Sequence, residues 1–374
     1  MEAALALRAF AGERAGVEII DPAPGFTVPA TAPGRVVDLV SGSELPLDRV
    51  VEWAGATLHR ARLAAVDPGR HLAMLAGGEL VTYEVLVVAV GARAVPHLPD
   101  AITFTGHAEV ANVRSLVEGI AHTAARGGRT DLAIVVPPGS AWPLAAYELA
   151  VLIRAHLAGL GHDSPGRTLV VTAEDSPLAV FGPQASDAVG RWMDDAGVEV
   201  LTGAVVRSWR WGRIELAGGE PLQADRMIAL PVLRGPRLEE LPTDAEGFVR
   251  STPDGRIAGV QDVWVAGDAG SFPVKQGGIA CQQADAIASA IARQLGAEVE
   301  EMPFAPVLRG WVWDEAGGRF LRAELGGGRT ESPGVAAGTP LWSPPAKVAG
   351  RFLAPFLRDL ERGRPPGPAA QRPG

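Results

Sequence analysis

Residues 263–285 read VWVAGDAGSFPVKQGGIACQQAD, and the order of residue types in this stretch decides the fold. Residues 263–266 have the composition of a buried strand, which ends on Gly267 and Asp268, and an alanine-rich helix follows from Gly277. In α/β proteins ligands bind where a parallel strand ends and a helix begins, because glycine admits the ligand to the backbone and free helix N–H groups point at it. The stretch therefore predicts a ligand site built on a strand, a loop and a helix N-terminus.

Lys275 lies in the loop of this predicted site. The chain has 34 basic residues, and only Lys275 and Lys347 among them are lysines. A solvated surface lysine is the plain interpretation of Lys275. Its rarity and its place between strand and helix instead favour a role in the site.

The length of the chain predicts two or three domains. The chain has 374 residues, of which 47% are hydrophobic and 21% charged, and a single core rarely grows much beyond roughly 250 residues. No apolar run approaches the roughly 18 residues that span a bilayer, and no signal peptide opens the sequence, so we expect a cytoplasmic protein. The net charge of −9 gives no basic surface for a polyanion and argues against nucleic acid as a partner.

Thiol chemistry and metal binding are both disfavoured by the sequence. Cys281 is the single cysteine, so the chain forms no internal disulfide and carries no dithiol pair. The seven histidines are scattered, without a pair at the helical spacing that binds a metal, and we expect no metal site.

Helical and strand-like patterns alternate along the chain, which indicates an α/β fold with parallel sheets. Residues 2–11 predict a helix, and residues 16–21 predict a short strand that ends on Asp21. In a dinucleotide-binding unit such an acid follows the loop G-x-G-x-x-G by roughly 20 positions. Counting back from Asp21 places that loop and the innermost strand upstream of Met1. The sequence thus predicts that Met1 is an alternative start inside a longer gene product; the alternative is that Met1 is the true start.

A second unit of the same kind is expected in the middle of the chain. Residues 132–136 predict a buried strand, residues 144–157 a helix and residues 168–172 a further strand, which Glu174 follows. The connecting loop, PPGSAWP, keeps one glycine, and Trp142 in it would crowd a pyrophosphate. If a nicotinamide nucleotide binds here, Glu174 favours the ribose hydroxyl of NADH over the phosphate of NADPH.

A third apolar run, residues 85–90, predicts a strand covered on both faces and ended by Gly91. We divide the chain into a first nucleotide-binding domain (1–118), a second domain of this kind (119–235), the return of the first domain (236–302) and a C-terminal segment (303–374).

The C-terminal segment is rich in Trp, Gly and Pro and ends in a tail, from Arg364, whose composition is typical of disorder. Residues 348–360 carry a helical apolar stripe that Pro355 interrupts. The stripe predicts a helix packed on the core, with docking to a membrane surface as the alternative.

Five stretches carry a family likeness. They are VWVAGDA at 263–269, PVKQGGIACQQAD at 273–285, YEVLVVAVGA at 83–92, WPLAAYELA at 142–150 and LWSPPAKVAGRFLAPFL at 341–357. Together they resemble the two-dinucleotide-binding-domain flavoproteins of the FAD/NAD(P)-binding pyridine nucleotide-disulfide oxidoreductase superfamily. Within it, the sequence looks like the sulfide:quinone oxidoreductase and type II NADH dehydrogenase branch, over nearly the whole chain except the expected missing beginning. The resemblance implies an α/β fold with two Rossmann-like domains, parallel central sheets and a small C-terminal segment.

The resemblance implies FAD as the cofactor and assigns its binding to Asp21, Gly91, Gly267, Asp268, Lys275, Gln276, Gly277 and Gly278. Asp268 would accept a hydrogen bond from a ribityl hydroxyl, and Asp21 would hold the adenosine ribose unless it is a chance acid at a strand end. The helix from Gly277 would point its N–H groups at the pyrimidine edge of the flavin, where reduced flavin gathers negative charge. Lys275 would place a cation beside the same edge or the flavin N5.

Lys275 and Glu148 are the candidate catalytic residues. Glu148 corresponds to a family glutamate that lies near the flavin and relays protons, although alone it would be an ordinary helix acid. Gln282 and Gln283 occupy the place of a glutamine-containing quinone motif in the quinone-reducing relatives, so either could bind a quinone carbonyl; ordinary helix-surface glutamines are the alternative. Cys281 is expected to pack in the core rather than to face the flavin.

The single cysteine separates this chain from part of the family, because sulfide oxidation and disulfide reduction there depend on cysteine pairs. The sequence thus predicts an FAD-dependent oxidoreductase that passes electrons from a small-molecule donor, with NADH as a candidate, through flavin to a quinone or another acceptor. The competing hypotheses are a non-catalytic scaffold with this fold and a flavoprotein subunit that reduces a protein partner. The C-terminal segment is the candidate for peripheral contact with the inner face of a membrane, and the sequence leaves the oligomeric state open.

Overall fold

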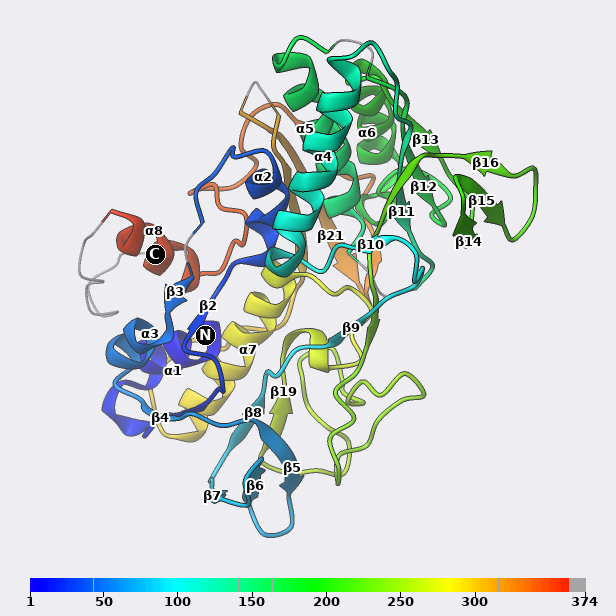
Figure 1. Cartoon of the computed structure of the whole chain (residues 1–374). Helices are drawn as coiled ribbons and strands as arrows, with labels where there is room; N and C mark the ends of the chain where they lie inside the picture. The colour runs from blue at the N-terminus through cyan, green and yellow to red at the C-terminus, as the bar shows by residue number, and fades with distance from the viewer. Residues whose placement is uncertain (43, 140–141, 163–164, 315–316, 363–374) are drawn as a thin grey trace.

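The structure is a computed structural model that describes residues 1–42, 44–139, 142–162, 165–314 and 317–362. The predicted tail from Arg364 and two residues of the loop 137–143 lie outside the described residues. Figure 1 places the middle of the chain in the upper part of the molecule, and the N-terminal residues together with the segment around α7 in the lower part. The chain thus leaves the lower part, forms the upper part and returns to the lower part with α7.

Five parallel strands form the sheet of the upper part, in the order β10 (Ile102–Thr103), β17 (Arg226–Ala229), β11 (Leu132–Val136), β12 (Thr168–Thr172) and β13 (Val198–Leu201). Every residue of β11 and β12 is buried, which explains why both are almost entirely apolar. The accompanying helices are α4 (Val110–Ala124), α5 (Leu144–Gly159) and α6 (Pro183–Asp195). The predicted strand–helix–strand unit is confirmed, and its helix ends at Gly159 rather than at Leu157.

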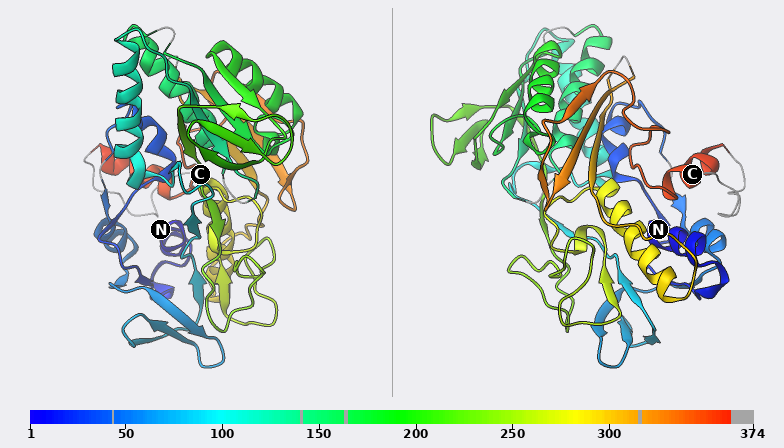
Figure 2. Two further views of the ribbon diagram at one scale, coloured as in Figure 1. Left: turned by 45° about the vertical axis from the view of Figure 1, so that its right-hand side comes forward. Right: turned by 180° about the vertical axis from the view of Figure 1, so that it is seen from behind.

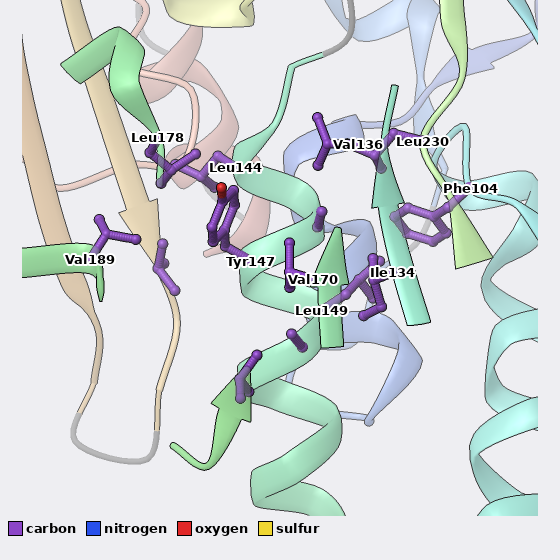
Figure 3. Close-up of a cluster of buried hydrophobic side chains, with 14 of the residues drawn as sticks. Phe104, Ile134, Val136, Leu144, Tyr147, Leu149, Val170, Leu178, Val189 and Leu230 are labelled. Atoms are coloured by element: carbon purple, nitrogen blue, oxygen red, sulfur yellow. The ribbon is translucent and has the colours of Figure 1, made fainter. Parts of the chain in front are cut away.

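Helix α5 lies inside the molecule rather than on its surface. Tyr147 and Leu149 of α5 join Ile134 of β11 and Val170 of β12 in one buried cluster (Figure 3). The helix also contacts α2 (Ala32–Val36) and the C-terminal strand β20 (Val307–Val312). Because α5 is covered on several sides, it is apolar nearly all round, and a polar residue on it needs a partner.

Two separate parallel pairs of strands lie in the lower part. Strand β1 (Glu18–Ile20) pairs with β4 (Thr57–His59), and β8 (Leu86–Val88) pairs with β19 (Val263–Val265). Helices α1 (Glu2–Ala11) and α7 (Gly277–Gln294) pack against each other beside these strands (Figure 1). Among the described residues no strand bridges β1 and β8, so each pair keeps an unpaired edge.

The predicted strand at residues 85–90 is shorter and more exposed than expected. Strand β8 covers Leu86–Val88, of which Val88 is buried, whereas Ala89 and Val90 are exposed. The prediction of a strand covered on both faces is wrong, because the unpaired edge of β8 leaves the end of this run open.

Smaller sheets and helices complete both parts. Two antiparallel strands, β9 (Arg93–Val95) and β18 (Val232–Arg234), run side by side between the parts. The remaining elements are β2 (Gly25–Phe26), β3 (Leu45–Pro46), α3 (Leu47–Ala54), β5 (Leu63–Asp67), β6 (Leu72–Leu75), β7 (Leu80–Thr82), β14 (Val206–Arg210), β15 (Arg213–Leu216) and β16 (Leu222–Gln223).

The C-terminal segment packs on the rest of the chain. Its antiparallel sheet contains β20, β21 (Arg319–Gly326), β22 (Arg329–Thr330) and β23 (Val335–Ala337), and α8 (Leu353–Glu361) follows. Phe356 of α8 is buried in a cluster with Leu5 of α1, as the core-packing interpretation predicts. Pro355 does not interrupt the helix: it lies in the first turn, where its missing N–H has no helical partner to lose. None of the described helices has the length and apolar content needed to cross a membrane.

Candidate functional site

Gly267 opens the predicted site at the end of β19. Its φ of +69° is a conformation that glycine adopts without strain, and a Cβ here would lie 3.0 Å from the Cβ of Ala280 in α7. The backbone N–H of Gly267 donates to Oε1 of Gln283 at 2.8 Å. The glycine thus brings the strand end close to helix α7 and fixes it there.

Asp268 is half-buried directly after this glycine. Its carboxylate accepts no hydrogen bond from any group in the described part of the chain, and burial raises its pKa while nearby Lys275 lowers it. A partly desolvated carboxylate without a donor is unfavourable on its own, so its surroundings fit a ligand that supplies a hydroxyl.

Lys275 is turned inward, with 7% of its surface exposed, which contradicts the interpretation as a solvated surface lysine. Its Nζ donates to the carbonyl oxygens of Gly270 and, at 3.3 Å, Asp268, and lies 3.9 Å from the centre of the Phe248 ring. Burial lowers the pKa of Lys275 to about 8, against the opposing effect of Asp268. The ammonium is therefore held within the strand–loop–helix site.

Gln276 caps helix α7 rather than standing free toward a cofactor. Its Oε1 accepts from the N–H of Ile279 at 2.8 Å, and its Nε2 donates to the carbonyl of Arg309 at 3.2 Å. The first-turn N–H groups of Gly277 and Gly278 have no partner within the helix and provide an anion-favouring end. Gln276 thus caps the N-terminus of α7 and fixes its position, while the N–H groups of Gly277 and Gly278 stay available to a ligand.

The two predicted quinone ligands are already engaged by the backbone. Gln282 accepts from the N–H of Val307 at 2.8 Å and donates to the carbonyls of Gly278 and Val307. Gln283 accepts from Gly267 and donates to the carbonyl of Pro253 at 3.0 Å. The expectation that one of these amides is free to bind a quinone is corrected: both hold α7 in place, because a buried helix must satisfy its polar side chains internally.

Glu148 lies in a second buried cluster. Its carboxylate, 1% exposed, forms an ion pair with Lys347, whose side chain is 6% exposed, and accepts from the N–H of Trp313 at 2.8 Å. Nζ of Lys347 also donates to the carbonyl of Trp311 and lies 3.8 Å from the ring centre of Trp313. Burial raises the pKa of Glu148 and lowers that of Lys347, and each charge opposes the shift of the other.

Lys347 has no predicted role in the sequence reasoning, although it is the other of the two lysines. The residue after it, Val348, lies 3.3 Å from the position of a Cβ on Gly277. The backbone that carries Lys347 therefore passes close to the start of α7. Lys275 precedes the start of α7 by two residues, and Glu148 is linked to the same region through Lys347 and its neighbour Val348.

Asp21 and Gly91 follow the carboxyl ends of β1 and β8, one strand from each parallel pair of the lower part. Oδ1 of Asp21 accepts from the N–H of Ala23 at 2.8 Å, which closes the turn after β1. Gly91, at φ +73°, follows β8, and a Cβ there would meet nothing within 4 Å. Gly91 is thus required by its backbone conformation, and the space beside it is open.

Cys281 lies within the first turns of α7 and is packed against Gly350. It is buried, its Sγ lies 3.0 Å from a Cβ position on Gly350, and burial raises its pKa well above the ordinary value, as expected for a packed thiol. One turn further, Asp285 has its pKa raised to about 9 by burial and by the neighbouring carboxylate of Glu2, to which it is hydrogen-bonded. Glu2 in turn accepts from the N–H groups of Phe352 and Leu353 at 2.8 and 2.7 Å.

Glu174 of the second unit is directed into the protein. It accepts from the hydroxyls of Tyr147 and Thr172, both at 2.9 Å, and from backbone groups of the following turn. The expectation that Glu174 binds the ribose of NADH is not met, because these donors occupy its carboxylate. Trp142 packs edge-on against Phe181, with 5.8 Å between ring centres.

The site as a whole fits the flavin half of FAD. It offers an acceptor without a donor at Asp268, free helix N–H groups at Gly277 and Gly278, and a cation at Lys275. These groups match ribityl hydroxyls and a ring edge that becomes negative on reduction. Fewer of the described protein groups could bind the adenosine half of FAD. No described strand pairs with the open edges of β1 and β8, and no described loop follows there to bind phosphates.

Similarity to solved structures confirms the predicted fold class, an α/β fold with parallel central sheets. Among solved structures, the chain is similar to the sulfide:quinone oxidoreductase from the hyperthermophilic bacterium Aquifex aeolicus, with a TM-score of 0.78 and 14% identity over 90% of this chain and 83% of the other. A ferredoxin reductase from Rhodopseudomonas palustris matches with a TM-score of 0.63 and 18% identity, over 86% and 79% of the two chains. An NAD-dependent persulfide reductase from A. fulgidus matches with a TM-score of 0.61 and 16% identity, over 86% and 61%. No family model and no curated protein matches the sequence.

Proposed function

We propose that this protein is an FAD-dependent oxidoreductase that works without thiols. The observation that carries the proposal is the half-buried Asp268 carboxylate, which lacks a donor and stands beside the open N-terminus of α7. FAD would supply hydride and electron transfer, while the protein supplies position and electrostatics. Cys281, the single cysteine, is buried and packed, which supports a reaction that uses no cysteine pair.

In this proposal each group at the helix end has a separate task. Asp268 accepts from the ribityl chain and orients the ring system, and the N–H groups of Gly277 and Gly278 stabilise negative charge at its edge. Lys275 adds a positive charge within the same desolvated region, where electrostatic interactions are stronger than in water. Its lowered pKa, about 8, allows it to carry or release a proton near neutral pH.

We propose that the Glu148–Lys347 pair handles the protons that accompany reduction of the acceptor. The pair is buried, its members have pKa values shifted toward each other, and Val348 beside it contacts the start of α7. Shifts in these opposite directions lower the cost of moving a proton between the two groups. A quinone-like acceptor would use this route in place of the glutamine amides, which bind the backbone.

The donor is proposed to be a small reduced molecule, with NADH as the first to test. Glu174 does not support recognition of the ribose, since its carboxylate is occupied by Tyr147 and Thr172. Reduction by NADH would therefore depend on other contacts in the second domain.

We further propose that one more parallel strand, encoded upstream in the same reading frame, lies between β1 and β8. Both strands belong to parallel pairs and both keep an unpaired edge. A parallel sheet with an internal gap leaves backbone groups without partners, which is unfavourable. Such a strand would also bring the glycine-rich loop that the position of Asp21 predicts.

The test compares the visible absorption spectrum of the printed chain with that of a chain extended upstream. We expect stoichiometric flavin in the extended chain, and about ten- to a hundredfold weaker flavin binding after Asp268→Asn, because a hydrogen bond to a charged group is lost. Asp262→Asn, at an exposed position with positive φ, is the matched control and should bind flavin normally. Equal flavin in both chains would refute the strand proposal alone. Absence of flavin from both would refute the oxidoreductase and favour a scaffold.

A further inference from the structure

Trp211 occupies the tip of the hairpin β14–β15 and is 99% exposed. Arg210 and Arg213 pair across the strands, so the loop contains two residues, Trp211 and Gly212, with φ of 49° and 82°. A loop of this kind favours Asn-Gly, and a bulky side chain at positive φ is unusual. The hairpin thus keeps a large apolar side chain in water at a position where its backbone conformation is unfavourable.

The neighbouring Trp209 shows that exposure is not a general property of this hairpin. Its ring is half-buried against the sheet, and its Nε1 donates to the carbonyl of Ala224 at 2.9 Å. Ile214 on the partner strand is wholly buried. The base of the hairpin is therefore fixed to the core, and it presents Trp211 rigidly beyond the surface.

The charge of the tip is opposite to that of the chain. Residues 207–213 read RSWRWGR, with three exposed arginines and no acid, while the whole chain has a net charge of −9. Arg213 forms an ion pair with Glu215 at 2.5 Å, whereas no ion pair involves Arg207 or Arg210 in the described residues. A cationic, tryptophan-bearing tip on an acidic protein is complementary to an anionic surface.

We propose that this tip docks on anionic lipid. Tryptophan is the side chain best suited to the headgroup level, since its ring is apolar and its N–H remains hydrated, and adjacent arginines attract lipid phosphates. A protruding ring can enter a fluid lipid interface without a preformed pocket, whereas a protein partner would need a matching cavity. The hairpin projects on the opposite side of the molecule from α8, so this contact is separate from any contact made by α8 (Figures 1 and 2).

The experiment measures sedimentation of the full chain with vesicles of phosphatidylcholine, alone or mixed equally with phosphatidylglycerol. We expect binding to the mixed vesicles, weakened by added salt. Trp211→Asn should weaken it by about tenfold or more, because the buried ring area is lost, and each of Arg207→Gln and Arg210→Gln by about fivefold. Asn suits a positive φ, so the Trp211→Asn protein should remain folded.

Leu160→Ala is the matched control, since Leu160 is another exposed apolar residue, 53% exposed, at the end of α5. It should bind vesicles as the unchanged chain does. Equal binding by the Trp211→Asn protein, equal binding to neutral vesicles, or no binding to either vesicle would each overturn the proposal. In the last case, crosslinking from position 211 to a protein would identify a protein partner instead.

Discussion

The buried ion pair between Glu148 and Lys347 leads to a quantitative prediction. Lys347→Met keeps an unbranched apolar stem of similar length and removes the charge. The Glu148 carboxylate, 1% exposed, then keeps the N–H of Trp313 as its remaining partner. Removing one member of a buried pair costs ~3–5 kcal/mol of the free energy of unfolding. We expect a loss of this size at pH 8.

The loss should depend on pH. Burial already raises the pKa of Glu148 above its ordinary 4.5, and without Lys347 it rises further. A group with a raised pKa in the folded state makes its full contribution to stability at pH values below its ordinary pKa. Above the ordinary pKa this contribution falls by ~1.4 kcal/mol per pH unit, until the pH reaches the pKa of the folded state. The variant should therefore lose little stability near pH 4.5 and progressively more toward pH 8.

Urea unfolding followed by circular dichroism, at pH 5 and pH 8, measures this difference. The control is the double variant Lys347→Met with Glu148→Gln, which removes both charges and should lie within ~1 kcal/mol of the unchanged protein at both pH values. A cost below ~1 kcal/mol at pH 8, or the same cost at pH 5 and pH 8, would refute the reasoning.

Three further predictions concern residues outside this pair. Asp285→Asn should stabilise the protein by ~1–3 kcal/mol at pH 8 and by less at pH 5. The pKa of Asp285 beside Glu2 is about 9, so the native state loses stability as pH rises above the ordinary aspartate pKa of 3.8. Unfolding curves at both pH values check this, and a constant difference would contradict it. Gly235→Ala should cost more than ~3 kcal/mol, because its Cβ would lie 1.9 Å from neighbouring backbone, whereas Gly190→Ala inside α6 should gain ~0.5–1 kcal/mol, as a shift in urea midpoint shows. Gln282→Ala should cost ~1–3 kcal/mol, since its amide binds backbone on both sides; unchanged stability would restore it as a free ligand-binding group.

The sequence predicts the elements of this fold well where they are continuous and buried. Residues 132–136 and 168–172 became strands with the predicted bounds, and helix α1 matches residues 2–11. The apolar faces of these segments are covered by other elements, so the period of their apolar residues is enough to predict helix or strand. The run 85–90 fails because its environment, an open strand edge, is a property of the tertiary structure and leaves no mark on the local pattern.

The site shows the same division. A local motif in the sequence singles out Gly267 and Asp268, and Gly267 lies against Ala280 of α7. The partner of Glu148 is not local: Lys347 lies 199 residues away in the chain, and no local pattern connects the two residues. Gln276, Gln282 and Gln283 were given ligand roles because a sequence cannot show which backbone groups a side chain will meet.

The backbone N–H groups of Phe352 and Leu353 donate to Glu2, which lies 350 and 351 positions earlier in the chain. A ribosome adding about 5–20 residues per second needs roughly 20–70 s to traverse that interval. During this time α1 exists without the backbone N–H groups that bind its Glu2 carboxylate, and Asp285 of α7, which lies beside Glu2, is made more than 280 residues after it. Helix α1 therefore cannot reach its final environment until residues 352 and 353 have left the ribosome.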